Sequence, residues 1–317
     1  MSDASSSSGN GLQVIPRIVS DLRSYFNLHG TKQGTWRKAQ LRACLRLMEE
    51  NEPAIRAALL SDVGKPWFEA TFTEIVKVQT SIRSMLEQLD EWVAPVPCPT
   101  PVVLLPGTSY IIREPLGVIL IIAPFNYPFQ LTMLPLIAAI AAGNCALIKP
   151  SEEAPACSKL IAELIPRYLD TQAFRVVPGS IPETTALLAQ KFDKIFFTGS
   201  TNVGRIVAEA AAKTLTPCTL ELGGKSPVIL GADADIPLAA RRTMWGQRKH
   251  AAHCDDGSDR RELCDPRTHH RCRDSLTCSH DFSPSPRSSV GLCFAQANVS
   301  MPASHASLLI ICSFPLI

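Results

Sequence analysis

Two polar side chains stand in apolar surroundings where a catalytic group could act. Glu221 lies inside the apolar segment 219–222, which two glycines follow. Partial burial there would raise the pKa of the Glu221 carboxyl group and suit it to general-base catalysis, although a single acid beside a turn is more often structural. Asn126 follows the apolar segment 117–122, where its amide could donate to an oxyanion or bond its own backbone in a turn. Both residues are candidates for catalysis.

A glycine-bounded turn could hold a phosphate group. It follows the apolar segment 194–197 and runs from Thr198 to Gly204, with Gly199, Ser200, Thr201, Asn202, Val203 and Gly204 as the candidate binding residues. Between a strand and a helix, such a turn lets backbone N–H groups and a helix N-terminus face a pyrophosphate. The spacing matches neither G-x-G-x-x-G nor a phosphate-binding loop, so an ordinary turn is an equally good interpretation.

A second turn places opposite charges close together. Lys149 ends an apolar segment, and Glu152 follows it three residues later. The ammonium and the carboxylate could both bond the hydroxyl groups of a ribose. Alternatively, Ser151 could cap the next helix, because the acids Glu152 and Glu153 would suit the dipole of its first turn. The two interpretations are compatible, since a cap also forms the rim of a site.

Short apolar segments that alternate with helical periodicity must position these side chains. Strands are expected at residues 117–122, 146–148, 174–177, 194–197 and 219–222, with helices at 128–142, 154–169, 182–189 and 202–213 between them. Buried strands joined by helices pair in parallel through right-handed crossovers. The expected fold class is therefore α/β, with a doubly wound, Rossmann-like parallel sheet. A nucleotide at the carboxyl ends of the strands is the default ligand of such a sheet.

Two helices and a proline-rich segment precede this alternation. Apolar spacing predicts helix over residues 35–60, interrupted near Pro53, and again over residues 68–89. Prolines at positions 95, 97, 99 and 101 then exclude both a helix and a central strand. We expect residues 95–109 to form an extended arm that crosses over a neighbour.

The overall composition is that of a globular chain. Its 317 residues are 46% hydrophobic, and 31 basic against 29 acidic residues leave a net charge of +2. So small a charge argues against nucleic acid as the main partner. Residues 1–11 are polar and lack the basic start and apolar core of a signal peptide, which predicts a disordered leader in a cytoplasmic protein. Prolines interrupt the apolar stretch 116–148, so no membrane anchor is expected.

The segment 248–317 has a different composition from the rest. It holds six of the eleven cysteines and six of the seven histidines. One alternative is a zinc site there, with ligands drawn from His250, His253, Cys254, Cys264, His269, His270, Cys272 and Cys278. The irregular spacing and the lack of a C-x-x-C pair argue against it, and no metal site is expected. The segment is typical of DNA translated out of frame or through an intron, and we expect it to be disordered.

Four segments, at residues 106–117, 142–152, 182–185 and 215–227, closely resemble the aldehyde dehydrogenase superfamily, and in particular its class 3 group of dimeric fatty and aromatic aldehyde dehydrogenases. The resemblance runs from Leu12 to Gln247. It implies an NAD(P)-binding domain at residues 12–94 and 110–221, an oligomerisation arm at 95–109 and the start of a catalytic domain at 222–247. It also implies an aldehyde substrate, NAD or NADP as cofactor, and a homodimer.

The resemblance assigns a role to each candidate residue. Asn126 would hold the oxyanion of a thiohemiacetal, and Lys149 and Glu152 would bind the adenine ribose. Gly199 to Gly204 would lie by the pyrophosphate. Glu221 would activate the water that hydrolyses a thioester, so that an aldehyde becomes a carboxylic acid. Phe125 stands where many relatives carry Trp, a change of packing more than of chemistry.

The resemblance stops before the nucleophile. Residues 1–317 contain no Gly-Gln-x-Cys, the motif whose cysteine attacks the aldehyde in relatives, and no Glu-x-Phe-Gly-Pro. Cys254 lies one residue from the expected place, but its neighbours do not match, and Asp255 and Asp256 would raise the pKa of its thiol. We therefore expect an incomplete catalytic domain and no normal turnover. A non-catalytic nucleotide-binding protein or a dimer decoy is the alternative, and the preferred aldehyde stays open.

Overall fold

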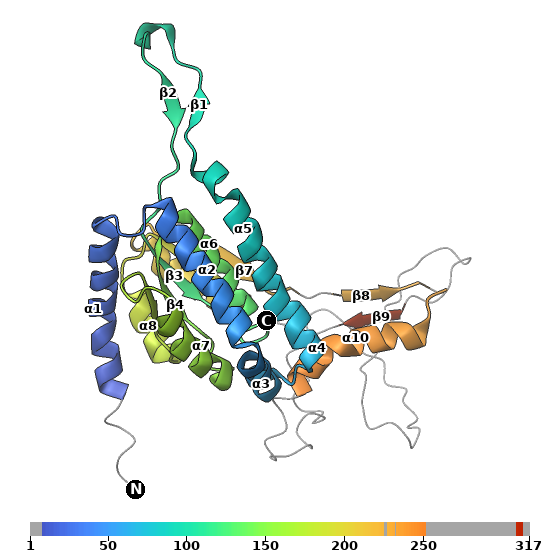
Figure 1. The fold of residues 1–317 in the computed structure, drawn as a ribbon. Coiled ribbons are helices and arrows are strands. Elements are labelled where there is room, and N and C mark those ends of the chain that lie inside the picture. The colour runs from blue at the N-terminus through green and yellow to red at the C-terminus, as the bar shows by residue number, and fades with distance from the viewer. Residues whose placement is uncertain (1–7, 225–226, 232, 252–308, 313–317) are drawn as a thin grey trace, which may run out of the picture. The chain divides into compact units, whose positions relative to one another are not determined.

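The computed structural model describes residues 8–224, 227–231, 233–251 and 309–312 (Figure 1). The chain divides into two compact units, residues 1–222 and residues 223–317. The first holds every residue for which a role was predicted. The second holds the whole cysteine- and histidine-rich segment. Of the eight residues of the zinc-site alternative only His250 is among the described residues, so that alternative lies outside what the structure describes.

A sheet of five parallel strands forms the centre of the first unit. Its strands are β3 (Val118–Ile122), β4 (Cys145–Lys149), β5 (Phe174–Val176), β6 (Lys194–Gly199) and β7 (Cys218–Leu222), in the order β5-β4-β3-β6-β7. Every residue of β3 and β4 is buried, as expected for apolar runs covered on both faces. The strand order runs outward from β3 in both directions, which confirms the predicted doubly wound sheet.

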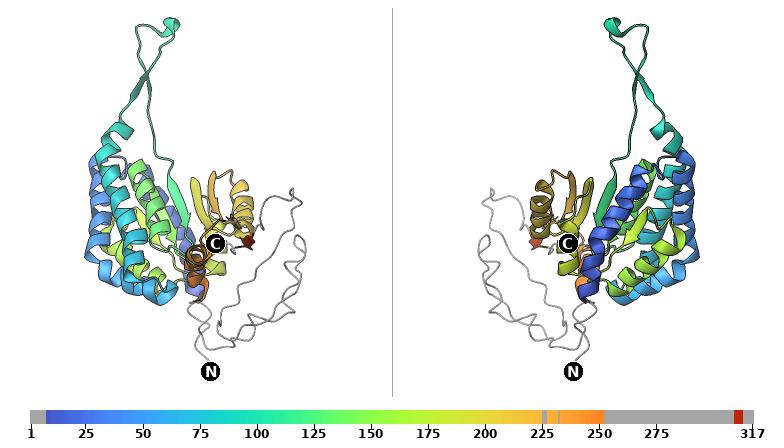
Figure 2. Two further views of the ribbon diagram at one scale, coloured as in Figure 1. Left: turned by 90° about the vertical axis from the view of Figure 1, so that its right-hand side faces the viewer. Right: turned by 90° about the vertical axis from the view of Figure 1, so that its left-hand side faces the viewer.

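Helices cover both faces of the sheet. The crossover helices are α6 (Gln130–Ala142), α7 (Pro155–Tyr168), α8 (Ile181–Leu188) and α9 (Thr201–Ala212). On one face, α6 and α7 contact an outer layer made by α2 (Gly34–Glu50), α3 (Glu52–Val63) and α5 (Lys77–Val93). On the other face, α8 contacts α9 and α1 (Ser8–Asn27). Figure 2 shows helices on both sides of the sheet. The layered packing places the main hydrophobic core on both sides of β3 and β4.

The N-terminal helices differ from the prediction in two places. Helix α1 was not predicted, and because it begins at Ser8, the expected disordered leader 1–11 is wrong for residues 8–11. The helix expected over 35–60 is interrupted as predicted, because a new helix, α3, begins at Glu52 with Pro53 in its first turn. The next helix, expected at 68–89, opens with α4 (Trp67–Glu69) and the π-helical η1 (Ala70–Val76).

The proline-rich segment folds as a hairpin. Strand β1 (Val96–Cys98) pairs in antiparallel fashion with β2 (Ser109–Ile111), and the short 3₁₀-helix η2 (Val102–Leu104) lies at its tip (Figure 1). Both strands are edges of a two-stranded sheet, which is where a strand tolerates a proline such as Pro97. The role of this hairpin in oligomerisation stays a prediction.

The second unit contains β8 (Pro227–Leu230), α10 (Ile236–Ala251) and β9 (Leu309–Cys312). Strand β9 pairs in antiparallel fashion with β8. The prediction of disorder over 248–317 is therefore wrong for residues 248–251, which continue α10, and for residues 309–312. An apolar run can satisfy its backbone by pairing with another strand, whatever the composition around it. Within the part of the chain that the structure describes, no helix is long and apolar enough to cross a membrane.

Candidate nucleotide site at the carboxyl edge of the sheet

The topology brings the predicted site residues to one edge of the sheet. Lys149 is the last residue of β4 and is level with Ile122, the last residue of β3. Glu221 is level with Thr198 on the neighbouring strands β7 and β6. Because parallel strands end at the same edge, the residues that follow β3, β4 and β6 surround the place where a doubly wound sheet binds a nucleotide. The predicted grouping of these residues thus agrees with the geometry.

Lys149 and Glu152 form an ion pair at this edge. The Lys149 side chain is only 4% exposed, whereas that of Glu152 is 37% exposed. The ammonium of Lys149 donates to the carboxylate of Glu152, three residues along the chain. A buried cation with one partner that reaches solvent is suited to sharing its N–H donors with a ribose, since the carboxylate can accept from the same hydroxyl groups.

The alternative role of Ser151 as a helix cap is wrong. Helix α7 begins at Pro155, and its N-cap residue is Ala154, which has no side-chain acceptor. The hydroxyl of Ser151 accepts the backbone N–H of Glu153 at 3.3 Å, and Glu153 lies before the helix begins. The first turn of α7 is capped instead by Asp62, at the end of α3, which accepts the N–H groups of Ala156 and Cys157 at 3.2 and 2.7 Å.

The glycine-bounded turn opens helix α9. Ser200 is its N-cap residue, and the Ser200 hydroxyl accepts the Val203 N–H at 3.3 Å. Any Cβ at Gly199 would lie 2.5 Å from the Phe197 ring, and one at Gly204 would lie 2.6 Å from Leu222. Both glycines therefore let the turn pack closely on the sheet. Residues 201–203 are exposed, so the helix N-terminus faces solution, as an anion site requires.

Thr198 begins the predicted turn, but no role in binding was predicted for it from the sequence. Its hydroxyl is buried and has no hydrogen-bond partner among the described residues. Thr198 is the last residue but one of β6 and directly precedes Gly199. Buried hydroxyl groups are rarely left without a partner, so this one is available to a ligand that enters the edge. An uncharged threonine at the end of an apolar strand gives no signal in sequence that would separate it from a core residue.

Asn126 lies in a turn that contacts Lys65 and Glu74, two residues that were not predicted from the sequence. Its side chain is 5% exposed, and its amide oxygen accepts the Tyr127 N–H at 3.1 Å. The Lys65 ammonium lies 3.7 Å from the centre of the Tyr127 ring and pairs with the Glu74 carboxylate. Neither Lys65 nor Glu74 was predicted, because charged residues are normally solvent-exposed.

The family-model comparison decides the family of this chain. The model described as "Aldehyde dehydrogenase family" matches residues 14–253. The chain belongs to the aldehyde dehydrogenase family. It is 47% identical over 230 residues to aldehyde dehydrogenase family 3 member I1 of Arabidopsis thaliana, which is chloroplastic, and 46% identical over 231 residues to family 3 member A2 of Mus musculus. Each alignment covers 73% of this chain, but only 42% and 48% of the two relatives.

Solved structures agree with this assignment. An aldehyde dehydrogenase of Staphylococcus aureus in a substrate-bound state is 45% identical, with a TM-score of 0.69, over 74% of this chain and 51% of its own. PnpE in complex with nicotinamide adenine dinucleotide is 27% identical, with a TM-score of 0.62, over 74% and 48% of the two chains. The chain thus spans about half the length of the relatives it matches.

Glu221 is the residue predicted to act as a general base, but the prediction that its side chain is partly buried is wrong. Its side chain is exposed, while that of Leu220 packs against the core. Strand β7 is at the edge of the sheet, and alternate side chains point to opposite faces. Within the first unit, the face that Glu221 occupies is open to solvent.

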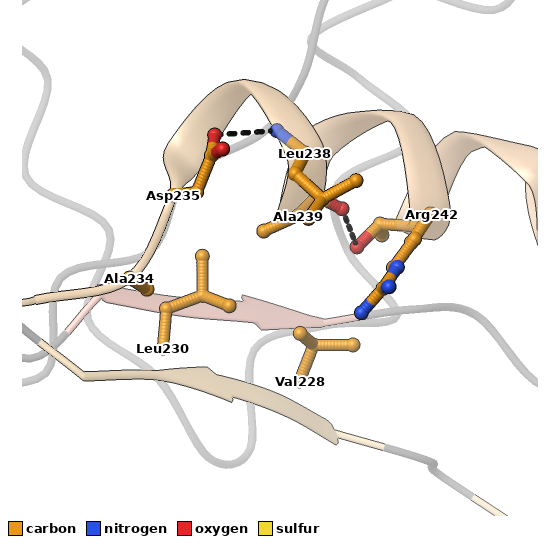
Figure 3. A pocket seen from close by; sticks show the side chains of 8 residues that line it. Val228, Leu230, Ala234, Asp235, Leu238, Ala239 and Arg242 are labelled. Atoms are coloured by element: carbon orange, nitrogen blue, oxygen red, sulfur yellow. Dashed lines mark hydrogen bonds between the residues drawn. The ribbon is translucent and has the colours of Figure 1, made fainter.

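The second unit has a hollow of its own, which is separate from the predicted site residues. Val228 and Leu230 of β8 and Leu238 of α10 form its apolar part, and Arg242 extends along it (Figure 3). Asp235 accepts the Leu238 N–H at 2.9 Å and so caps the first turn of α10. Among the described residues, no group of three His, Cys, Asp or Glu side chains could hold a metal ion.

Proposed function

We propose that this chain binds NAD or NADP at the carboxyl edge of the five-stranded sheet. The observation that supports the proposal is the convergence of three binding groups there: the Lys149–Glu152 pair, the unpartnered Thr198 hydroxyl and the open N-terminus of α9. They fit a ribose and a pyrophosphate, which need hydroxyl partners and N–H donors. A dog relative carries the name "dimeric NADP-preferring", and the PnpE structure holds NAD.

In this proposal each side chain has a binding or positioning task. Lys149 and Glu152 hold the adenine ribose, and residues Gly199 to Gly204 hold the pyrophosphate through backbone N–H groups. The Asn126 amide donates to the oxygen of an aldehyde as that oxygen gains charge. Glu221 would take the proton of a water that attacks a thioester, a step that needs the thiolate of the Gly-Gln-x-Cys motif. The nicotinamide, when bound, supplies a hydride acceptor.

We further propose that the chain binds the nucleotide without oxidising aldehydes to carboxylic acids. The family reaction needs a thiolate to attack the carbonyl carbon before hydride leaves. Residues 1–317 contain no Gly-Gln-x-Cys. The amides and carboxylates named above cannot replace a thiolate, which attacks the aldehyde as the nucleophile and later leaves from the thioester. Purified chain incubated with NAD and a fatty or aromatic aldehyde should form no NADH. Formation of NADH at a rate above that of heat-denatured chain would contradict this proposal.

The choice between the two nucleotides rests on one carboxylate. The Glu152 carboxylate lies where it would accept hydrogen bonds from the ribose hydroxyl groups of NAD. Its negative charge would repel the 2′-phosphate of NADP. We expect calorimetric titration to give tighter binding of NAD than of NADP, and Glu152→Gln to narrow the difference. Lys149→Met, which keeps the length of the side chain and removes the N–H donors, should weaken both nucleotides at least about tenfold.

The hairpin β1–β2 is the proposed contact of a homodimer. It exposes the apolar side chains of Val102, Val103 and Leu105, which are 82%, 89% and 61% exposed. A contiguous apolar surface of this kind marks a protein interface. Light scattering should give the mass of a dimer for the chain and of a monomer for Val103→Lys. A monomeric wild-type chain at micromolar concentration would contradict the proposal.

The cytoplasmic location expected from the sequence also stays a proposal, since one relative at 47% identity is chloroplastic. A fluorescent fusion of the chain, imaged in the cells that express it, tests this location.

A further inference from the structure

The pair formed by Lys65 and Glu74 is the most deeply buried ion pair among the described residues. Both side chains have no exposed surface, and the ammonium donates to one carboxylate oxygen. Burying two charges costs several kcal/mol per ion, and apolar residues of similar size are often as stabilising. Stability alone therefore does not explain the pair, and its contacts suggest a positioning role.

Glu74 serves as the missing cap of helix α6. The N-cap residue of α6 is Phe129, which has no side-chain acceptor. The second carboxylate oxygen of Glu74 accepts the backbone N–H of Phe129 at 2.9 Å and that of Gln130 at 3.1 Å. Burial raises the pKa of the Glu74 carboxyl group, while the Lys65 ammonium and these N–H groups oppose that shift. The Glu74 carboxyl group thus fixes the start of α6.

Lys65 holds the other part of the same turn. Its ammonium lies 3.7 Å from the centre of the Tyr127 ring, a cation–π contact in a desolvated setting. Tyr127 follows Asn126 and donates its N–H to the Asn126 side chain. The two members of the pair therefore contact the connection from β3 to α6 at Tyr127, which directly follows Asn126, and at Phe129 and Gln130, where α6 begins.

We propose that Lys65 and Glu74 are positioning residues for the nicotinamide half of the nucleotide. This inference rests on the proposed nucleotide site, in which Lys149 holds the adenine ribose and Asn126 lies at the reacting end. The turn they hold follows β3, the central strand, whereas the adenine ribose site follows β4. A loosened turn should therefore weaken the binding of NAD, whose nicotinamide half would lie at the turn after β3. It should leave unchanged the binding of a ligand that occupies only the adenine ribose site after β4.

Calorimetric titrations with NAD and with 5′-AMP test the inference. The variant Glu74→Gln keeps the size of the side chain, removes its charge and replaces one of its two acceptor oxygens by an NH2 group. The variant therefore cannot accept from both Lys65 and the two N–H groups through separate oxygens. It should weaken NAD binding about tenfold and change 5′-AMP binding less than about twofold. Asp62→Asn is the matched control, since Asp62 caps α7 after β4; it should weaken both ligands to a similar degree.

A second variant guards against failure to fold. Lys65→Met combined with Glu74→Leu fills the same space with apolar groups, so it should keep the circular dichroism spectrum of the wild type. It leaves α6 without a cap and should show the same selective loss of NAD affinity. Equal loss of both ligands, or no loss of NAD affinity, in folded variants would overturn the inference alone. A wild-type chain that binds neither ligand would overturn the proposed function, and the inference with it.

Discussion

The crossover helices on the two faces of the sheet begin in different ways. Helices α8 and α9 are capped by their own sequence: Glu183 accepts the Ser180 N–H at 2.8 Å, and Ser200 accepts the Val203 N–H. Helices α6 and α7 have Phe129 and Ala154 at the N-cap position and borrow carboxylates from Glu74 and Asp62. Those carboxylates lie 55 and 95 residues away along the chain.

The difference shows how the N-terminal helices contribute to the site. Asp62 ends α3 and Glu74 lies in η1, so one short stretch of chain fixes the starts of both helices that follow β3 and β4. The turns before these helices contain Asn126 and the Lys149–Glu152 pair. The outer helical layer therefore does more than cover the core, because it supplies hydrogen-bond acceptors that the two turns lack.

The largest effect is expected from removing a borrowed cap that is also half of an ion pair. Glu74→Ala leaves the Lys65 ammonium buried without its carboxylate, which should lower the free energy of unfolding by about 3–5 kcal/mol. Urea unfolding followed by circular dichroism measures it. The double variant Lys65→Met with Glu74→Leu should lose much less. If the single and double variants lose equal stability, the ion pair is not what the fold depends on here.

A borrowed cap without an ion-pair partner should matter less. Asp62→Ala removes a carboxylate that accepts two N–H groups of α7, and we expect a loss of about 1.5–3 kcal/mol in the same unfolding experiment. Hydrogen exchange should also speed up at Ala156 and Cys157. Unchanged exchange at these amides would show that water replaces Asp62 at no cost.

The smallest effect is expected at a local cap that faces solvent. Ser200→Ala removes the acceptor for the Val203 N–H at an exposed helix start, and the loss should be about 1 kcal/mol or less. Ser200→Asn, which can also cap, is the control and should unfold as the wild type does. A loss from Ser200→Ala larger than that from Asp62→Ala would reverse the ranking of local and borrowed caps.

The same contrast explains what the sequence could predict. Strands and crossover helices of the sheet follow from apolar runs of the right period, and the turn at Gly199 follows from its own glycines. The Lys149–Glu152 pair is close in sequence and was predicted as a charged pair at the edge. In each of these cases, the residues that determine the structure are neighbours in the chain.

The parts that could not be predicted depend on distant contacts. The pattern gave Ser151 as the cap of α7 because the real acceptor, Asp62, is remote in sequence. Lys65 and Glu74 look like ordinary surface charges until α6 brings backbone N–H groups to them. Glu221 lies in an apolar strand, yet an edge position leaves its side chain exposed. Helix α1 was missed for another reason, since a polar start hid its later periodicity.

A crystal structure of the chain with NAD tests the proposed function most directly. We expect density for the nucleotide along the carboxyl edge of the sheet, with the adenine ribose at Lys149 and Glu152, the pyrophosphate at the start of α9, and the Thr198 hydroxyl within hydrogen-bond distance of the ligand. Crystals grown at saturating NAD that show nucleotide density elsewhere, or none, would contradict the assignment of this edge as the nucleotide site.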